Sequence, residues 1–313
     1  MTTGQGAPTD GQPDGAQIAH GGGSGGTGGR IRIVTDSLAW IPDDLVRQHR
    51  LTVVPLHIHF GEQQFTETVD LTNQEFYARL REGGTLPKTS APSPGEFLDA
   101  YRRVAAEADA ILSVHFTSKM SATYQSAEIA AAQLREERPD VRIETIDTLQ
   151  AAMAEGIVAI RAAEDATRGL SFDEVVAGAR ALVRKSHVYL TVETLEYLQK
   201  GGRIGRAQAF LGGLLQIRPV MTVQDGIITP LARERTMTRA LDRIVQLIAD
   251  YAQGRPLGHA CVLHALAEDA ARRVARQLEE RFTIQRPIIF SEIGPVIGTY
   301  VGPGALGVTF HCD

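Results

Sequence analysis

The chain has 313 residues, of which 43% are hydrophobic and 22% are charged, a composition typical of a soluble globular protein with about two domains. Its formal net charge of −5 argues against nonspecific nucleic-acid binding. No uninterrupted apolar run approaches the roughly 20 residues that span a bilayer, and no apolar signal-peptide region follows a basic start. We therefore expect a cytoplasmic protein.

The only two cysteines, Cys261 and Cys312, have no CxxC spacing and no histidines at ligand spacing. This pattern indicates two buried, unreactive thiols, and neither a disulfide framework nor a metal site is expected.

Residues 1–29 are rich in Gly, Thr, Gln and Pro and contain almost no apolar side chains. Such a segment cannot offset its own ordering entropy, so we expect a disordered tail. A glycine-rich ligand loop is the alternative, but no strand precedes these glycines, and neither a GxGxxG motif nor a P-loop lysine is present.

Between residues 30 and 169, short β-branched runs alternate with helical patterns. Strands are expected at 31–34, 51–60, 110–114 and 141–146, and helices near 45–46 and 74–80, and at 121–136 and 150–168. Strands that alternate with helices of this length predict βαβ units and a parallel sheet. We therefore expect an α/β domain over 30–169.

From 170 to 313 the pattern changes. Helices are expected at 172–185 and 238–253, strands at 188–192 and 257–264, and a β-hairpin at 220–232 with a glycine-containing turn. Hairpins mixed with helices predict an α+β domain with a mixed sheet over 170–313.

The segment 88–97 carries several hydroxyls in a turn that precedes a helix. Ser93 has the spacing to Glu96 of a capping box, which explains Ser93 as a helix cap. Capping does not explain Thr89 and Ser90, so these two hydroxyls remain available to a ligand.

The segment 116–127 joins the predicted strand 110–114 to the next helix. Open parallel sheets bind ligands beyond the carboxyl ends of their strands, and a helix N-terminus suits a carboxylate or a phosphate. Ser121 lies at this position. It is equally explained as a helix cap, and both interpretations stay open.

Two further segments are unusual. In 193–206 a short helix ends at a glycine pair and is followed by Arg203 and Arg206, which either bind phosphate or are solvated surface arginines. The glycine-rich segment 293–307 predicts a tight bend or close backbone approach, with Tyr300 as its polar tip.

Motifs of catalysis are absent: there is no Walker A sequence, kinase loop, GxSxG, HExxH or adjacent catalytic dyad. The residues alone therefore predict an α/β protein that binds an anion, without catalytic residues.

Five motifs, in order, resemble those of the DegV family from about residue 31 to the end of the chain. They are VTDS at 34–37, KTSAPS at 88–93, SATYQSA at 121–127, LQKGGRI at 198–204 and GTYVGPG at 298–304. The resemblance implies a two-domain DegV-like fold with a long-chain fatty acid buried in the first domain and no cofactor.

The resemblance also implies a function. Such proteins are similar to the acyl-carrying subunit of bacterial fatty acid kinase, in which a separate ATP-dependent kinase protein phosphorylates the exposed carboxylate for phospholipid synthesis. The expected partners are the fatty acid and this kinase, with a transient membrane-surface contact and no nucleic acid.

By resemblance, Thr89 and Ser121 bind the carboxylate, with Ser90 and Ala122 adjacent to them. Arg203 and Arg235 match family arginines that face the phosphate or the kinase. The chain departs from the family pattern at two positions.

Ala122 replaces a glycine, and its methyl group could narrow the backbone approach beside Ser121. Tyr300 replaces a histidine that reaches the carboxylate. A phenol can still donate a hydrogen bond but carries no charge near neutral pH, so Tyr300 is expected to bind the carboxylate.

Two other functions are considered. A stand-alone acyl-group hydrolase or transferase would need a nucleophile with a nearby base, which the sequence does not suggest. A transcriptional or purely structural role is disfavoured by the acidic net charge and by the lack of a helix-turn-helix motif with clustered basic residues.

Overall fold

The computed structural model describes residues 1, 30–83, 86–211 and 217–312. Apart from Met1, the tail predicted over residues 1–29 lies outside the described residues.

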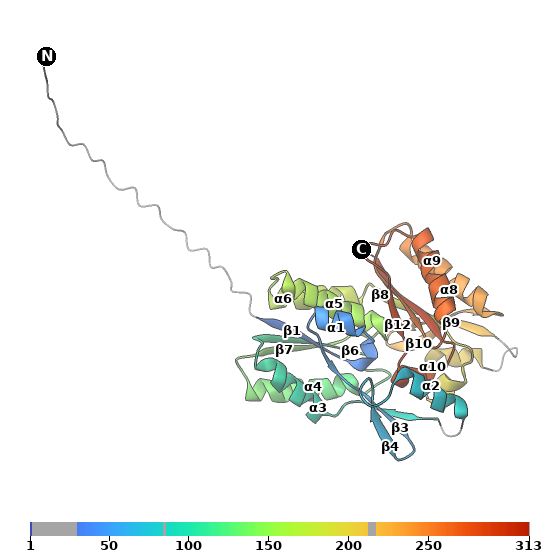
Figure 1. The fold of residues 1–313 in the computed structure, drawn as a ribbon, viewed down its shortest axis with the longest axis horizontal. Helices are drawn as coiled ribbons and strands as arrows, with labels where there is room; N and C mark the ends of the chain where they lie inside the picture. The colour runs from blue at the N-terminus through green and yellow to red at the C-terminus, as the bar shows by residue number, and fades with distance from the viewer. Residues whose placement is uncertain (2–29, 84–85, 212–216, 313) are drawn as a thin grey trace.

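A four-stranded parallel sheet with the order β2-β1-β6-β7 forms the centre of the first half (Figure 1). Its strands are β1 (Ile31–Asp36), β2 (Thr52–Val54), β6 (Ala110–His115) and β7 (Arg142–Asp147). The helices of this half are α1 (Asp43–Gln48), α2 (Asn73–Glu82), α3 (Pro94–Ala105), α4 (Thr123–Glu137) and α5 (Met153–Thr167), with a 3-10 turn, η1 (Ser37–Ala39), after β1. Helix α5 covers one face of the sheet, and α3 and α4 cover the other. The predicted parallel α/β domain is confirmed.

The predicted strand over 51–60 is wrong, because the chain breaks at Pro55 into two strands that belong to different sheets. Strand β2 ends at Val54 in the parallel sheet, whereas β3 (His57–Phe60) pairs antiparallel with β4 (Gln63–Thr66) and β5 (Lys88–Ser90). Proline has no N–H to donate to a ladder, so it separates the two pairings.

The second half contains a six-stranded mixed sheet with the order β10-β9-β8-β13-β11-β12. Its strands are β8 (Ser186–Thr191), β9 (Arg218–Gln224), β10 (Ile227–Glu234), β11 (Leu257–His264), β12 (Ile289–Glu292) and β13 (Leu306–Cys312). The remaining elements are α6 (Phe172–Val183), α7 (Glu196–Lys200), η2 (Gly205–Phe210), α8 (Met237–Ala252), α9 (Glu268–Arg281) and α10 (Pro295–Val301). The predicted hairpin is confirmed, and its turn residues Asp225 and Gly226 both have positive φ, as a tight two-residue hairpin turn requires.

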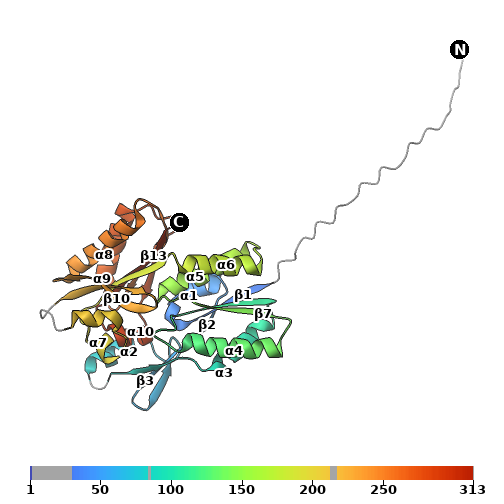
Figure 2. The same ribbon diagram turned by 180° about the vertical axis from the view of Figure 1, so that it is seen from behind.

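Helices α8 and α9 pack on one face of the six-stranded sheet, while α5 contacts β8 and β13 in addition to the parallel sheet. Figure 2 shows from behind that α5 and α6 lie on the same side of the parallel sheet, with α5 nearer to the six-stranded sheet. One apolar core is continuous through both halves, from Leu112 through Ile157 to Leu263. A boundary between the two domains near residues 169 and 170 remains our proposal. It falls between α5 and α6, which pack against each other.

Local helix signals were reliable. Both Thr72–Glu75 and Ser93–Glu96 form capping boxes at the starts of α2 and α3. Helix α4 differs from its prediction, since it begins at Thr123 with Ala122 at the cap position, two residues after Ser121. In the described part of the chain, no helix is long and apolar enough to cross a membrane.

The glycine-rich closing segment forms the short helix α10 and packs very closely on its surroundings. A Cβ atom at Gly298 would lie 2.8 Å from the ring of Phe76 and 2.8 Å from the Tyr77 hydroxyl. The predicted close backbone approach is thus present, and it presses α10 against α2. This contact fixes the position of Tyr300, near the C-terminal end of α10.

Candidate functional site

A cavity of about 260 Å³ lies between the carboxyl edge of the parallel sheet and one face of the six-stranded sheet. From the first half, its walls come from residues that follow the carboxyl ends of all four parallel strands: Leu38, Trp40, Leu56, Phe116, Met120, Ser121, Ala122, Ala151 and Ala152. Ligands are expected at this edge of an open parallel sheet. The family resemblance implied a ligand site within the first domain, but the second half supplies much of the lining of this cavity.

The six-stranded sheet provides the apolar floor. Ile228 of β10 pairs with Val223 of β9, and Gly307 of β13 pairs with Leu190 of β8 on one side and Leu263 of β11 on the other. All five residues line the cavity. The cavity therefore runs across the strands, from the β10 edge of the sheet toward β12.

Hydroxyl groups gather on one part of the cavity wall. The Thr89 Oγ1 atom of β5 lies 2.6 Å from the Tyr300 hydroxyl of α10, and both side chains are half-buried. The Arg203 guanidinium lies 5.1 Å from the centre of the Tyr300 ring and donates to the carbonyl oxygen of Met120 at 3.2 Å. Ser121 follows Met120 directly, so the structure brings these predicted residues to one cavity.

Ser121 lines this wall beside the start of α4. Its Oγ lies 2.8 Å from Thr123 Oγ1 and accepts the Thr123 N–H at 3.3 Å. The helix-cap interpretation of Ser121 is wrong, because Ala122 takes the cap position of α4. Ser121 lines the cavity, and its binding of a ligand stays a prediction. Ala122 lines the cavity as well.

Two predicted residues lie elsewhere. Ser90 is absent from the cavity lining, and its hydroxyl hydrogen-bonds His59 Nε2 at 3.0 Å. Alternation along β5 explains this, since Thr89 and Ser90 point to opposite faces. Arg235 is exposed between β10 and α8 and does not line the cavity.

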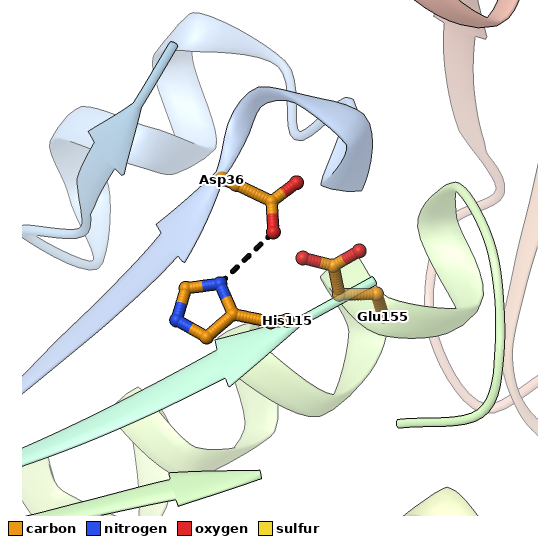
Figure 3. Close-up of side chains that lie close together, drawn as sticks. All are labelled: Asp36, His115 and Glu155. Atoms are coloured by element: carbon orange, nitrogen blue, oxygen red, sulfur yellow. Dashed lines mark hydrogen bonds and ion pairs between the residues drawn. The ribbon is translucent and has the colours of Figure 1, made fainter. Parts of the chain in front are cut away.

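A second polar cluster, which sequence reasoning missed, is built on the VTDS motif at the end of β1 (Figure 3). The Asp36 Oδ2 atom accepts a hydrogen bond of 2.9 Å from His115 Nδ1, and His115 Nε2 lies 2.6 Å from Ser113 Oγ. Because a carboxylate only accepts, the histidine proton is on Nδ1. Asp36 and His115 are the last residues of neighbouring parallel strands. The sequence could have predicted their proximity, because the carboxyl ends of adjacent parallel strands meet at one edge of the sheet.

Glu155 of α5 completes this cluster. Thr35 donates to it at 2.9 Å, and complete burial, together with the nearby Asp36 charge, raises the pKa of Glu155 well above its ordinary value. The ligand atoms of Asp36, His115 and Glu155 all lie within 4.8 Å of one another, the spacing of a metal site. Both ring nitrogens of His115 already have hydrogen-bond partners, so a cation there would have to displace one of them.

The order Ser113–His115–Asp36 also matches the connectivity of a hydrolase triad. However, Ser113 is fully buried, accepts a hydrogen bond from Tyr101 at 2.8 Å and lines no part of the cavity. Its hydroxyl cannot meet a ligand bound there. The cluster instead has a structural role. Asp36 accepts the Leu38 N–H at 3.0 Å and so holds Leu38, which lines the cavity, in place.

Glu67 is a third buried carboxyl group at this edge. It accepts hydrogen bonds from the Ser37 hydroxyl and, at 2.8 Å, from the Val296 N–H in the first turn of α10. Burial is the main cause that raises the pKa of Glu67 to about 7. Glu67 thus connects the VTDS motif to the helix that carries Tyr300.

Two sheets that enclose an apolar cavity with hydroxyls on one wall define an α/β protein with a built ligand-binding site. The profile of the DegV family, described as a family of uncharacterised proteins, matches residues 30–312. The chain belongs to the DegV family.

Individual relatives in sequence and in structure are also DegV family proteins. A DegV domain-containing protein of Clostridium acetobutylicum is 36% identical over 283 residues, which cover 90% of this chain and 98% of the relative. A DegV family protein from Thermus thermophilus, whose structure is described for fatty acid binding, has a TM-score of 0.85 and 35% identity, and the match covers 91% of this chain and 100% of the other. DegV of Bacillus subtilis, described as a fatty acid binding protein, has a TM-score of 0.82 and 31% identity over 91% of this chain and 100% of the other.

The raised pKa of Glu67 predicts a specific pH dependence of stability. Between the ordinary value of 4.5 and about 7, the folded state keeps a proton that the unfolded chain releases. The free energy of unfolding therefore falls as the pH rises through this range. At about 1.4 kcal/mol per pH unit, the loss is about 3 kcal/mol.

Glu67→Gln keeps the shape of the neutral acid and removes the titration. In urea unfolding, its stability should exceed that of the wild type by a margin that grows from about pH 5 to about pH 8. Glu75→Gln is the matched control. Glu75 is exposed, and hydrogen bonds from Thr72 lower its pKa, so no such gain is expected there. A constant difference between Glu67→Gln and the wild type would contradict the assignment.

Proposed function

We propose that this protein binds one long-chain fatty acid, with its carboxylate held by Thr89, Ser121 and Tyr300 and its tail in the apolar cavity. The observation that carries the proposal is a single cavity with an apolar floor and a wall that carries these three hydroxyls. The fatty acid binding described for the relatives from Thermus thermophilus and Bacillus subtilis supports it.

The energetics of this cavity suit such a ligand. Each buried methylene contributes roughly 0.8 kcal/mol. Desolvating the carboxylate is costly, and hydroxyl donors together with the N-terminus of the 15-residue helix α4 offset that cost. Arg203 places a positive charge beside the same hydroxyls, with its guanidinium over the Tyr300 ring.

We further propose that the chain presents this carboxylate to a separate ATP-dependent kinase, which forms the acyl-phosphate used in phospholipid synthesis. Both Arg203 and Arg235 are exposed and could meet a phosphate or the kinase. The protein itself then needs no catalytic group. This agrees with the Ser113 hydroxyl being buried away from the cavity. The stand-alone hydrolase remains the alternative function.

The carboxylate site is tested by titrating a fluorescent fatty acid into single variants. Thr89→Ala and Ser121→Ala each remove a donor to a charged group, which costs on the order of 1.5–3 kcal/mol of binding free energy. Tyr300→Phe should weaken binding in the same direction. Because the tail keeps its contacts, affinity drops without vanishing.

Ser90→Ala is the matched control, since its hydroxyl is adjacent in sequence but bonded to His59 outside the cavity. Its affinity should equal that of the wild type. Unchanged affinity in both Thr89→Ala and Ser121→Ala would mean that the carboxylate is bound elsewhere.

The role with a kinase is tested by Arg235→Ala. Because Arg235 lies outside the cavity, fatty acid affinity should stay within about twofold, while acyl-phosphate formation with a bacterial fatty acid kinase protein and ATP should fall at least about tenfold, as expected for a lost charged contact. Arg276→Ala, at an exposed position on α9, is the control and should behave as the wild type. Equal rates of acyl-phosphate formation for both variants would show that Arg235 does not contact the kinase.

A further inference from the structure

Helix α10 borders the cavity, since Val296, Ile297, Tyr300 and Val301 all line it. Near its C-terminal end Tyr300 meets Thr89, which marks the carboxylate end. Directly before its first residue, Gly294 packs against Trp40, because a Cβ atom at Gly294 would lie only 2.9 Å from Trp40 Cζ2. Gly294 and Tyr300 thus place Trp40 and the hydroxyls at different points of the cavity wall.

Trp40 also lies beside one edge of the six-stranded sheet. Its carbonyl oxygen accepts a hydrogen bond of 2.7 Å from Ser291 of β12, the strand at one edge of that sheet. The cavity floor begins with Ile228 on β10, at the opposite edge.

A second cavity, of about 230 Å³, lies beyond Trp40. Its lining is mixed: apolar residues such as Ile41, Val46 and Val53 stand beside polar and charged residues such as Asp36, Glu67 and Glu292. Of the residues that the structure describes, Trp40 alone lines both cavities. Trp40 therefore lies between the two cavities.

The backbone at Trp40 is unusual as well. Its φ of 53° and ψ of 38° are left-handed, a conformation that bulky side chains rarely adopt. The hydrogen bond from Ser291 and the packing against Gly294 hold the residue there. Strain of this kind persists where the surrounding structure fixes a side chain in one place.

We propose that the indole of Trp40 closes the tail end of the acyl cavity and sets the longest fatty acid that the protein accepts. This inference rests on the proposed function, since it concerns the same cavity. A chain that reaches Trp40 fills the apolar space. A longer chain has to displace the indole to reach the second cavity.

The wild-type protein provides the first test, because Trp40 is its only tryptophan. Bromine quenches indole emission on contact, so two long-chain fatty acids of equal length are compared. One carries bromine on its terminal carbon and the other next to the carboxylate. Terminal bromine should quench Trp40 emission at least severalfold more strongly. Equal quenching, or stronger quenching by the other isomer, would overturn the inference.

Substitution at Trp40 provides the second test. In a series of saturated fatty acids, affinity should rise about fourfold per added methylene until the tail reaches Trp40, and then fall. In Trp40→Ala the maximum should move to longer chains, whereas Trp40→Phe keeps an aromatic wall and should stay close to the wild-type maximum. A Trp40→Ala maximum at the wild-type length would overturn the inference.

These experiments distinguish a failure of fatty acid binding from a failure of the role of Trp40. If a fluorescent fatty acid shows no binding to the wild type, the proposed function fails and the inference fails with it. If both brominated acids displace that probe but quench equally, the fatty acid binds and only the role of Trp40 is wrong. The quenching comparison requires no variant, so it decides the matter even if Trp40→Ala does not fold.

Discussion

Three buried carboxyl groups at the end of β1 impose the constraint on which the site depends. A carboxyl group removed from water must be hydrogen-bonded or neutral, and each of these satisfies that requirement through a different element. Asp36 takes its partner from β6, Glu155 takes Thr35 and lies on α5, and Glu67 takes Ser37 and the first turn of α10. The VTDS motif therefore acts as the junction that holds the segments of the cavity wall together.

This junction explains how a site can form between two sheets. The cavity wall includes residues of both halves of the chain. Glu67 binds the first turn of α10, and this helix places Tyr300 beside Thr89. The buried carboxyl contacts thus stay outside the apolar space, while the hydroxyls lie on the cavity wall. An apolar floor with donors on one wall is the arrangement that a fatty acid requires.

Much of this fold was accessible from sequence because its signals are local. Alternating strands and helices gave the parallel sheet, and the spacing of Ser93 and Glu96 gave a helix start. The break at Pro55 was missed because the apolar alternation on both sides looks continuous. His115 was missed because its partner Asp36 is 79 residues away, and only strand order makes them neighbours. The shared lining of the cavity likewise depends on how two sheets pack, which no local pattern encodes.

The central claim is that one long-chain fatty acid occupies this cavity. Native mass spectrometry of protein purified from bacterial cells, followed by organic extraction of the same sample, tests it most directly. The account predicts a discrete added mass equal to one fatty acid per chain, and release of that fatty acid on extraction. A spectrum of the bare chain alone, together with an empty extract and no uptake of a fluorescent fatty acid, would contradict it.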